Sequence, residues 1–198
     1  EMCIRDRPQA IIATRTKATS NREKKPMELL TKRLRLRGPR DSDLKPLLHA
    51  MNDWRVIQWF DSLPYPHHEA DGEVWLRAVI DNLNGPEPGM FLVADINSDD
   101  LIGAATLERK EGSKRFYLGY WIAPRYWGQG YASEACRPLT EYAHDHLKLN
   151  ELFAAVAPHN AASKRVLSKL LFEEFSSEDR EGTRAGHHRM LLYRRELE

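Results

Sequence analysis

Two glycines at the start of a helical pattern give this chain its clearest chemical signal. Residues 125–132 read Arg-Tyr-Trp-Gly-Gln-Gly-Tyr-Ala, after an aromatic-rich strand pattern and before apolar spacing typical of a helix. The first turn of a helix leaves backbone N–H groups unpaired, and the helix dipole adds partial positive charge there. Gly128 and Gly130 have no Cβ to obstruct a ligand or forbid unusual dihedrals. The segment therefore predicts a phosphate site built from backbone N–H groups.

Two familiar phosphate loops do not fit this segment. The dinucleotide fingerprint requires a third glycine where Ser133 stands. The triphosphate loop ends in Gly-Lys-Ser or Gly-Lys-Thr, and no such tripeptide follows here. What remains is the pattern R-x-x-G-x-G-[YFH]-A leading into a helix. The alternative interpretation is a tight glycine turn that binds nothing.

Periodicity along the chain predicts a sheet with helices between its strands. Apolar and β-branched patterns predict strands at residues 34–37, 91–96, 101–107, 116–122, 152–157, 172–176 and 188–193. Helical spacing, with cap or turn residues at the ends, predicts helices at residues 44–51, 69–83, 132–147 and 160–171. The sequence therefore predicts the order β-α-α-β-β-β-α-β-α-β-β, which is an α/β fold without internal repeats.

This order and the glycine turn resemble the GNAT superfamily of N-acetyltransferases, over nearly everything from Leu34 to Tyr193. The string W-G-Q-G-Y-A-S-E-A is most similar to the branch that includes the ribosomal-protein-alanine N-acetyltransferases, the RimJ/RimL type. The resemblance implies a mixed, mostly antiparallel central sheet, with a V-shaped splay between two parallel strands and helices on its flanks. It also implies acetyl transfer from acetyl-coenzyme A, as co-substrate, to a primary amine by direct attack in a ternary complex. The acceptor would be a protein N-terminal α-amine or a small-molecule amine.

The resemblance also implies which residues hold acetyl-coenzyme A. The pantetheine arm would lie between strands 116–122 and 152–157, bonded to unpaired backbone groups near Trp121, Ile122 and Ala123. Asn160, a helix cap by its position, would hold the pantetheine as well. Arg125 would add a charge-assisted contact, or would be a solvated turn residue. The diphosphate would sit on backbone N–H groups of six consecutive residues, Trp127, Gly128, Gln129, Gly130, Tyr131 and Ala132.

The catalytic groups are less clearly marked. In similar enzymes a Ser at the position of Ser163, or a nearby Tyr, gives a proton to the leaving sulfur. A thiolate needs little help to leave near neutral pH, so Ser163 as an acid is one of two alternatives. Relatives often carry a Glu that acts as the general base where this chain has Tyr117. A phenol is a poor base at neutral pH. Glu108, at the end of the preceding strand, is the nearest alternative carboxylate; water relaying the proton is another.

The acceptor side is marked only by aromatic residues. Trp54, Trp59, Phe60 and Tyr65 fall where a fold of this type lines the acceptor pocket, and could hold an amine by cation–π contact or simply pack in the core. The adjacent histidine pairs at 67–68 and 187–188 cannot easily chelate one ion, because neighbouring side chains on a strand face opposite ways. We therefore expect no metal.

Composition limits the remaining possibilities. The 198 residues carry a formal net charge of +1 and no apolar run near the roughly 20 residues that span a bilayer, so we expect no membrane partner. The two cysteines, Cys3 and Cys136, form no C-x-x-C pair, which favours a reducing cytoplasm. Residues 27–198 are predicted to form one domain, as a monomer or homodimer.

Residues 1–26 form a polar segment with seven Lys/Arg against three acidic residues. We expect this segment to be a disordered or non-native extension. Contact with ribosomal RNA through its basic residues is an alternative, but no firm nucleic-acid partner is predicted.

Two functions from other classes stay open on the sequence alone. One is a non-catalytic acyl-coenzyme A-binding or ribosome-associated module, favoured by Tyr117 at the usual Glu position and by the basic arm. The other is a nucleotide-binding protein. Coenzyme A should stabilise an acetyltransferase more than ATP or NAD does, whereas a nucleotide-binding protein should show the reverse order.

Overall fold

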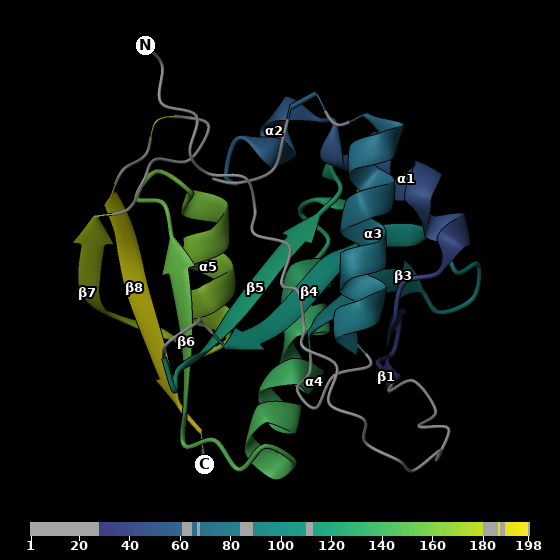
Figure 1. Ribbon diagram of the computed structural model, residues 1–198. Helices are drawn as coiled ribbons and strands as arrows, with labels where there is room; N and C mark the ends of the chain where they lie inside the picture. The colour runs from purple at the N-terminus through teal and green to yellow at the C-terminus, as the bar shows by residue number, and fades with distance from the viewer. Residues whose placement is uncertain are drawn as a thin grey trace, which may run out of the picture.

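The computed structural model of the protein describes residues 28–60, 65–66, 68–83, 89–109, 113–179, 186 and 189–197 (Figure 1). The N-terminal half contains β1 (Leu29–Leu30), β2 (Leu34–Arg37), η1 (Asp41–Asp43), α1 (Leu44–Met51), α2 (Trp54–Ile57), α3 (Glu69–Leu83), β3 (Met90–Asp95) and β4 (Leu101–Arg109). The C-terminal half contains β5 (Phe116–Ile122), η2 (Pro124–Tyr126), α4 (Tyr131–Asp145), β6 (Glu151–Val156), α5 (Ala161–Lys169), β7 (Glu173–Asp179) and β8 (Arg189–Glu196). The predicted extension at residues 1–26 lies outside the described residues.

The strands form one sheet in the order β1-β2-β3-β4-β5-β6-β8-β7. Every neighbouring pair is antiparallel except β5 and β6, which run parallel. A mixed, mostly antiparallel sheet with one parallel pair and flanking helices was predicted, and the structure confirms this fold class.

The parallel pair opens almost as soon as it forms. β5 and β6 pair at one position, Tyr117 with Phe153, near the start of both strands. Beyond it β6 pairs only with β8, through all six residues from Glu151 to Val156. One edge of β5 therefore loses its strand partner over the second half of the strand, which produces the predicted splay.

Helices cover both faces of the sheet (Figure 1). Helices α1, α2 and α3 pack on one face around a core that includes Leu47, Ile57, Leu76 and Trp121. Helices α4 and α5 pack on the other face, in a core that includes Leu139, Leu167 and Ile122. Since side chains alternate along a strand, β5 sends Trp121 to the first core and Ile122 to the second. The open end of β5 therefore lies between the two helical layers.

Helix α4 is fixed by a stripe of buried side chains. Ala135, Cys136, Leu139 and Ala143 recur at helical spacing, and all four have no exposed area. This stripe packs the helix along the sheet, and η2 and the glycine turn connect its N-terminus to the end of β5. Local sequence and packing therefore put the turn at the open end of the splay.

The predicted elements are all present with small shifts at their ends. The helix predicted at residues 69–83 matches α3, and the strand predicted at residues 116–122 matches β5. Strands β7 and β8 extend three residues beyond the predicted ends at 176 and 193. The two-residue strand β1 and the single-turn helix α2 were not predicted, because such short elements carry no clear period. None of the described helices is long and apolar enough to cross a bilayer.

A buried ion pair joins strand β2 to the 3₁₀ helix η1. Arg37 is 2 % exposed and donates to both carboxylate oxygens of Asp43, at 2.7 and 2.9 Å. It also donates to Asp99 at 3.0 and 3.1 Å, in the turn between β3 and β4. Arg40 donates to the same Asp99 at 2.8 Å. The network ties β2, η1 and the β3–β4 turn together on the side of the sheet where α1 packs.

Candidate active site

The glycine turn has the backbone that the sequence predicts. Gly128 and Gly130 have φ angles of +76° and +81°, in the left-handed region that favours glycine. A Cβ added at Gly128 would meet nothing within 4 Å, and one at Gly130 would meet only the Arg33 guanidinium, at 3.8 Å. The α-carbon of Gly128 therefore faces open space, and that of Gly130 faces only the end of the Arg33 side chain.

The turn presents a run of unused backbone donors. The N–H of Trp127 donates to Pro124 O at 3.2 Å, and that of Glu134 donates to Gly130 O at 3.1 Å. Between them, the N–H groups of residues 128–133 find no acceptor among the described residues. They surround the N-terminus of α4, where the helix dipole favours an anion. The expectation that Trp127 contributes its N–H is wrong, since that group closes the preceding 3₁₀ turn.

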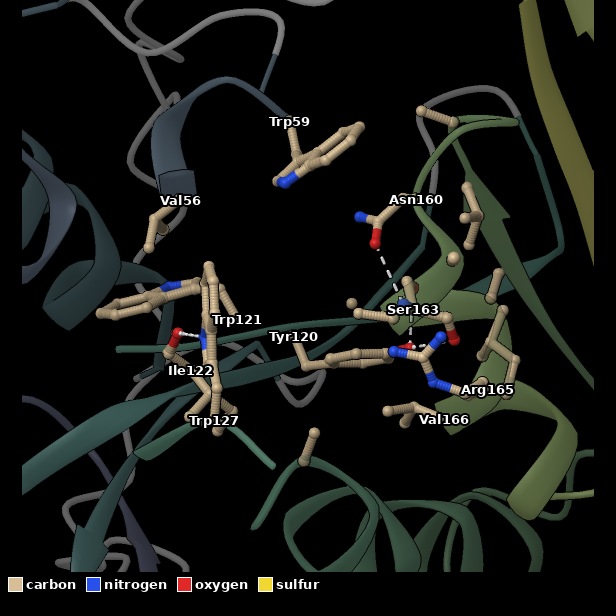
Figure 2. Close-up of a pocket in the computed structure, with 18 of the residues that line it drawn as sticks. Val56, Trp59, Tyr120, Trp121, Ile122, Trp127, Asn160, Ser163, Arg165 and Val166 are labelled. Carbon is tan, nitrogen blue, oxygen red and sulfur yellow. Dashed lines mark hydrogen bonds between the residues drawn. The ribbon is translucent and has the colours of Figure 1, made fainter. Parts of the chain in front are cut away.

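A cavity of about 790 Å³ begins at this turn and passes through the splay (Figure 2). It is lined by residues of the turn and of the first turn of α4, by β5 residues on both faces of the sheet, and by residues of β6 and α5. On the other side it is closed by Val56, Trp59 and Phe60, from α2 and the residues after it. The cavity therefore connects the α4–α5 side of the sheet with the α2 side.

Backbone groups of β5 border this cavity. The N–H of Ala123 donates to Ile102 O at 2.8 Å, and its carbonyl accepts from Tyr126 N at 2.9 Å, so the expectation of unpaired groups at Ala123 is wrong. Successive backbone groups alternate in direction, so those of Trp121 also turn toward β4, whereas those of Tyr120 and Ile122 face the opening. The Ile122 carbonyl accepts the Trp127 indole N–H at 2.6 Å (Figure 2). The Ile122 N–H therefore remains as a backbone donor that faces the splay beside this bond.

Asn160 and Ser163 lie together on the opposite wall. Asn160 precedes α5, and its Oδ1 accepts the Ser163 N–H at 3.0 Å, which is the predicted helix cap. Its amide nitrogen is turned toward Trp59 across the cavity (Figure 2). The cap therefore uses the oxygen and leaves the amide N–H groups directed at the space between the two walls.

Tyr120 reaches across the splay to Ser163. Its hydroxyl lies 2.8 Å from Ser163 Oγ and 3.1 Å from Ser163 O (Figure 2). Burial raises the pKa of Tyr120 above its usual range, so the phenol stays protonated at neutral pH. A nearby Tyr was expected as one alternative to Ser163, but the sequence did not single out Tyr120, because the contact exists only where β5 and β6 separate.

Two polar side chains next to the glycine turn point away from the cavity. The Arg125 guanidinium lies over the Tyr126 ring at 4.6 Å and approaches Leu101 O at 3.4 Å, and the side chain does not line the cavity. The Gln129 amide nitrogen approaches the Arg125 carbonyl at 3.3 Å. In this arrangement the Arg125 side chain is directed away from the turn, and its expected charge-assisted contact stays a prediction. Arg55 and the α5 residues Arg165 and Lys169 are the lining cations, which the sequence analysis did not single out.

Glu108 lies beside the cavity rather than in its wall. It is opposite Tyr117 in the β4–β5 register, on the face of the sheet that also carries Gly119 and Trp121. The residue is exposed, but desolvation of its carboxyl group raises its pKa above the usual value. A carboxylate thus stands next to the position where relatives often carry Glu, on the neighbouring strand.

The aromatic residues divide into two groups. Trp59 and Phe60 line the cavity on the α2 side. Trp54 and Tyr65 instead form an edge-to-face pair, with ring centroids 5.4 Å apart, and both are largely exposed. Half of the predicted acceptor cluster therefore faces the cavity. In the part of the chain that the structure describes, no group of three or more potential ligands is arranged to hold a metal ion.

Comparison with known proteins shows the family to which this chain belongs. Residues 33–173 match the family described as the acetyltransferase (GNAT) domain. The chain belongs to the GNAT acetyltransferase family. A Bacillus subtilis protein named "Putative ribosomal N-acetyltransferase YdaF" is 29% identical over 167 residues, which cover 81% of this chain and 88% of that protein.

Solved structures agree with the fold. The ribosomal-protein-S5-alanine acetyltransferase of Vibrio fischeri superposes with a TM-score of 0.74 at 16% identity, covering 87% of this chain and 97% of that one. RimJ of Mycobacterium smegmatis, solved with coenzyme A disulfide, gives a TM-score of 0.72 at 17% identity, covering 82% and 81%. The protein is thus an acyltransferase that uses acetyl-coenzyme A as co-substrate. The free N–H groups and the open space at Gly128 fit the diphosphate of that molecule.

Proposed function

We propose that this acetyltransferase acetylates a primary amine, by direct attack of the amine within a ternary complex. The acceptor is a protein N-terminal α-amine or a small-molecule amine. The observation that carries the proposal is the continuity of the cavity across the sheet, from the glycine turn to Trp59 on the α2 side. Such a passage allows a donor and an acceptor to meet from opposite sides within the splay.

The donor side is formed by backbone and amide groups. The N–H groups of residues 128–133 bind the diphosphate, and the exposed edge of β5 holds the pantetheine arm through Ile122 N–H. The Asn160 amide donates to the arm from the opposite wall, with its oxygen held by the helix cap. Acetyl-coenzyme A supplies the thioester that the amine attacks. These contacts orient the donor and leave the α2 side of the cavity to the acceptor.

Direct attack is favoured because the described cavity wall lacks an activated nucleophile. None of its lining residues is cysteine. Cys136 has no exposed area, and burial raises the pKa of its thiol well above the usual range. Ser163 is bonded to Tyr120, not to a histidine or a carboxylate that could act as a base. An acetyl group held on the protein therefore has no suitable site in this wall.

Proton movement is assigned to Ser163 and Glu108. The Ser163 hydroxyl, fixed by the protonated Tyr120 phenol, passes a proton to the departing sulfur and takes one back from solvent water. Glu108 accepts the proton of the amine through water, because its side chain does not line the cavity. The raised pKa of Glu108 suits this role, since it brings the basicity of the carboxylate closer to neutral pH.

An amine panel tests the proposal. The protein is incubated with acetyl-coenzyme A and with peptides, amino acids or polyamines that carry a free amine, and free thiol and acetylated product are measured. We expect thiol release that depends on the acceptor and equals the amide formed. A Gly128→Asp variant serves as the control for background hydrolysis. Tight binding of coenzyme A without acceptor-dependent release would contradict the proposal and favour a non-catalytic binding module.

A further inference from the structure

Side chains from the turn before β2 reach the first turn of α4, far away in sequence. Glu134 accepts the Thr31 hydroxyl at 2.7 Å, the Arg33 backbone N–H at 3.0 Å and the Arg33 Nε–H at 2.7 Å. Arg33 Nη2 lies 2.6 Å from the same carboxylate. The carboxylate of Glu134 is therefore surrounded by donors from one short segment of chain.

The same guanidinium also contacts the glycine turn itself. Arg33 Nη2 donates to the Gln129 carbonyl at 3.0 Å, and the guanidinium carbon lies 4.2 Å from the centre of the Tyr131 ring. A Cβ at Gly130 would lie 3.8 Å from Arg33 Nη2. One side chain thus contacts Gln129 and Tyr131 on either side of Gly130, and the N–H groups of all three residues are among the unused donors.

Glu134 poses an electrostatic problem for a diphosphate site. It lies in the first turn of α4, next to the donors that would face the phosphates. Burial acts to raise the pKa of Glu134, but hydrogen bonds from Thr31 and Arg33 outweigh burial and lower it, so the group is ionised at neutral pH. A bare carboxylate at that position would repel a phosphate, whereas a carboxylate paired with Arg33 presents little net charge.

We propose that Arg33 is a positioning residue for the diphosphate turn. Arg33 holds the Gln129 carbonyl turned away from the donors and neutralises Glu134, without lining the cavity itself. This role rests on the proposed placement of the diphosphate at residues 128–133. Strand β2, which follows Arg33, is already anchored by its ladder with β3 and by the buried Leu34 and Leu36, so the fold does not depend on this ion pair.

The test measures the Kd of coenzyme A by calorimetry in three variants. Arg33→Met should raise Kd about tenfold, since hydrogen bonds to charged groups contribute factors of about that size. Glu134→Gln should change Kd less than about threefold, because it removes a negative charge as well as an ion pair. The double variant should bind more tightly than Arg33→Met alone, since the unpaired carboxylate is gone. A purely structural role predicts instead that Kd and melting temperature change together in all three variants.

Two further readouts separate positioning from folding. Arg40→Met, which removes another ion-paired arginine far from the turn, should keep both Kd and melting temperature near those of the parent protein. S-Acetylpantetheine lacks the diphosphate, so Arg33→Met should reduce kcat/KM for acetyl-coenzyme A but leave that for S-acetylpantetheine nearly unchanged. Equal losses with both donors, or a double variant no better than Arg33→Met, would overturn the role of Arg33. If Gly128→Asp also left Kd unchanged, the diphosphate placement itself would be wrong.

Discussion

Replacing Gly128 by Asp or by Asn tests the proposed diphosphate site directly. Its φ of +76° is costly for side chains with a Cβ, by roughly 1–2 kcal/mol, but Asn and Asp tolerate it better than other residues. Because an added Cβ would meet no protein atom within 4 Å, both variants should fold. The two side chains have nearly the same shape and differ in charge. Comparing them therefore isolates electrostatic repulsion from steric obstruction.

The size of the difference follows from Coulomb's law. One added charge about 4 Å from a phosphate costs between ~1 kcal/mol in bulk water and ~4 kcal/mol near a protein surface. A tenfold change in Kd corresponds to ~1.4 kcal/mol, so Gly128→Asp should bind coenzyme A roughly 5- to 700-fold more weakly than Gly128→Asn. Both should bind more weakly than the parent protein, because each side chain fills space that the phosphates need.

Calorimetry at low and high salt provides the assay. The gap between Asp and Asn should shrink as salt rises, since ions screen exposed charges over a Debye length of about 10 Å at 0.1 M. The melting temperature without ligand should be similar for the two variants. Equal Kd values for Asp, Asn and the parent protein would refute the placement of the diphosphate at this turn.

Three other substitutions test the proton path and the fold. Ser163→Ala should lower kcat about tenfold with little change in the KM for acetyl-coenzyme A, a modest loss because a thiolate leaves readily; an unchanged kcat would remove Ser163 from the mechanism. In the parent protein the rate should rise as the pH increases through the raised pKa of Glu108, because only the ionised carboxylate acts as a base. Glu108→Gln should abolish this rise, and an identical pH profile in the variant would exclude Glu108. Asp43→Asn should lower the free energy of unfolding by about 3–5 kcal/mol in urea denaturation, since Arg37 would lose a buried partner. A loss below about 1 kcal/mol would show that Asp99 alone satisfies Arg37.

The site was predictable from the sequence where its parts are local. The glycine turn, the unpaired N–H groups and the Asn160 cap each depend on a few consecutive residues, so their patterns were visible along the chain. The direction of the Arg125 side chain was not predictable, because its sequence position fixes only its Cα. Its long side chain packs on the neighbouring Tyr126, which a pattern cannot reveal.

The sequence by itself determined the longer elements, their order and the backbone of the glycine turn, because periodicity and glycine act over short distances. Only the tertiary structure decided which side chains meet. Tyr120 reaches Ser163 across 43 residues, and Arg33 reaches Gln129 across 96. Such contacts depend on where β5 and β6 separate and on how α4 packs along the sheet. These are properties of the whole core, since each buried side chain constrains the position of its neighbours.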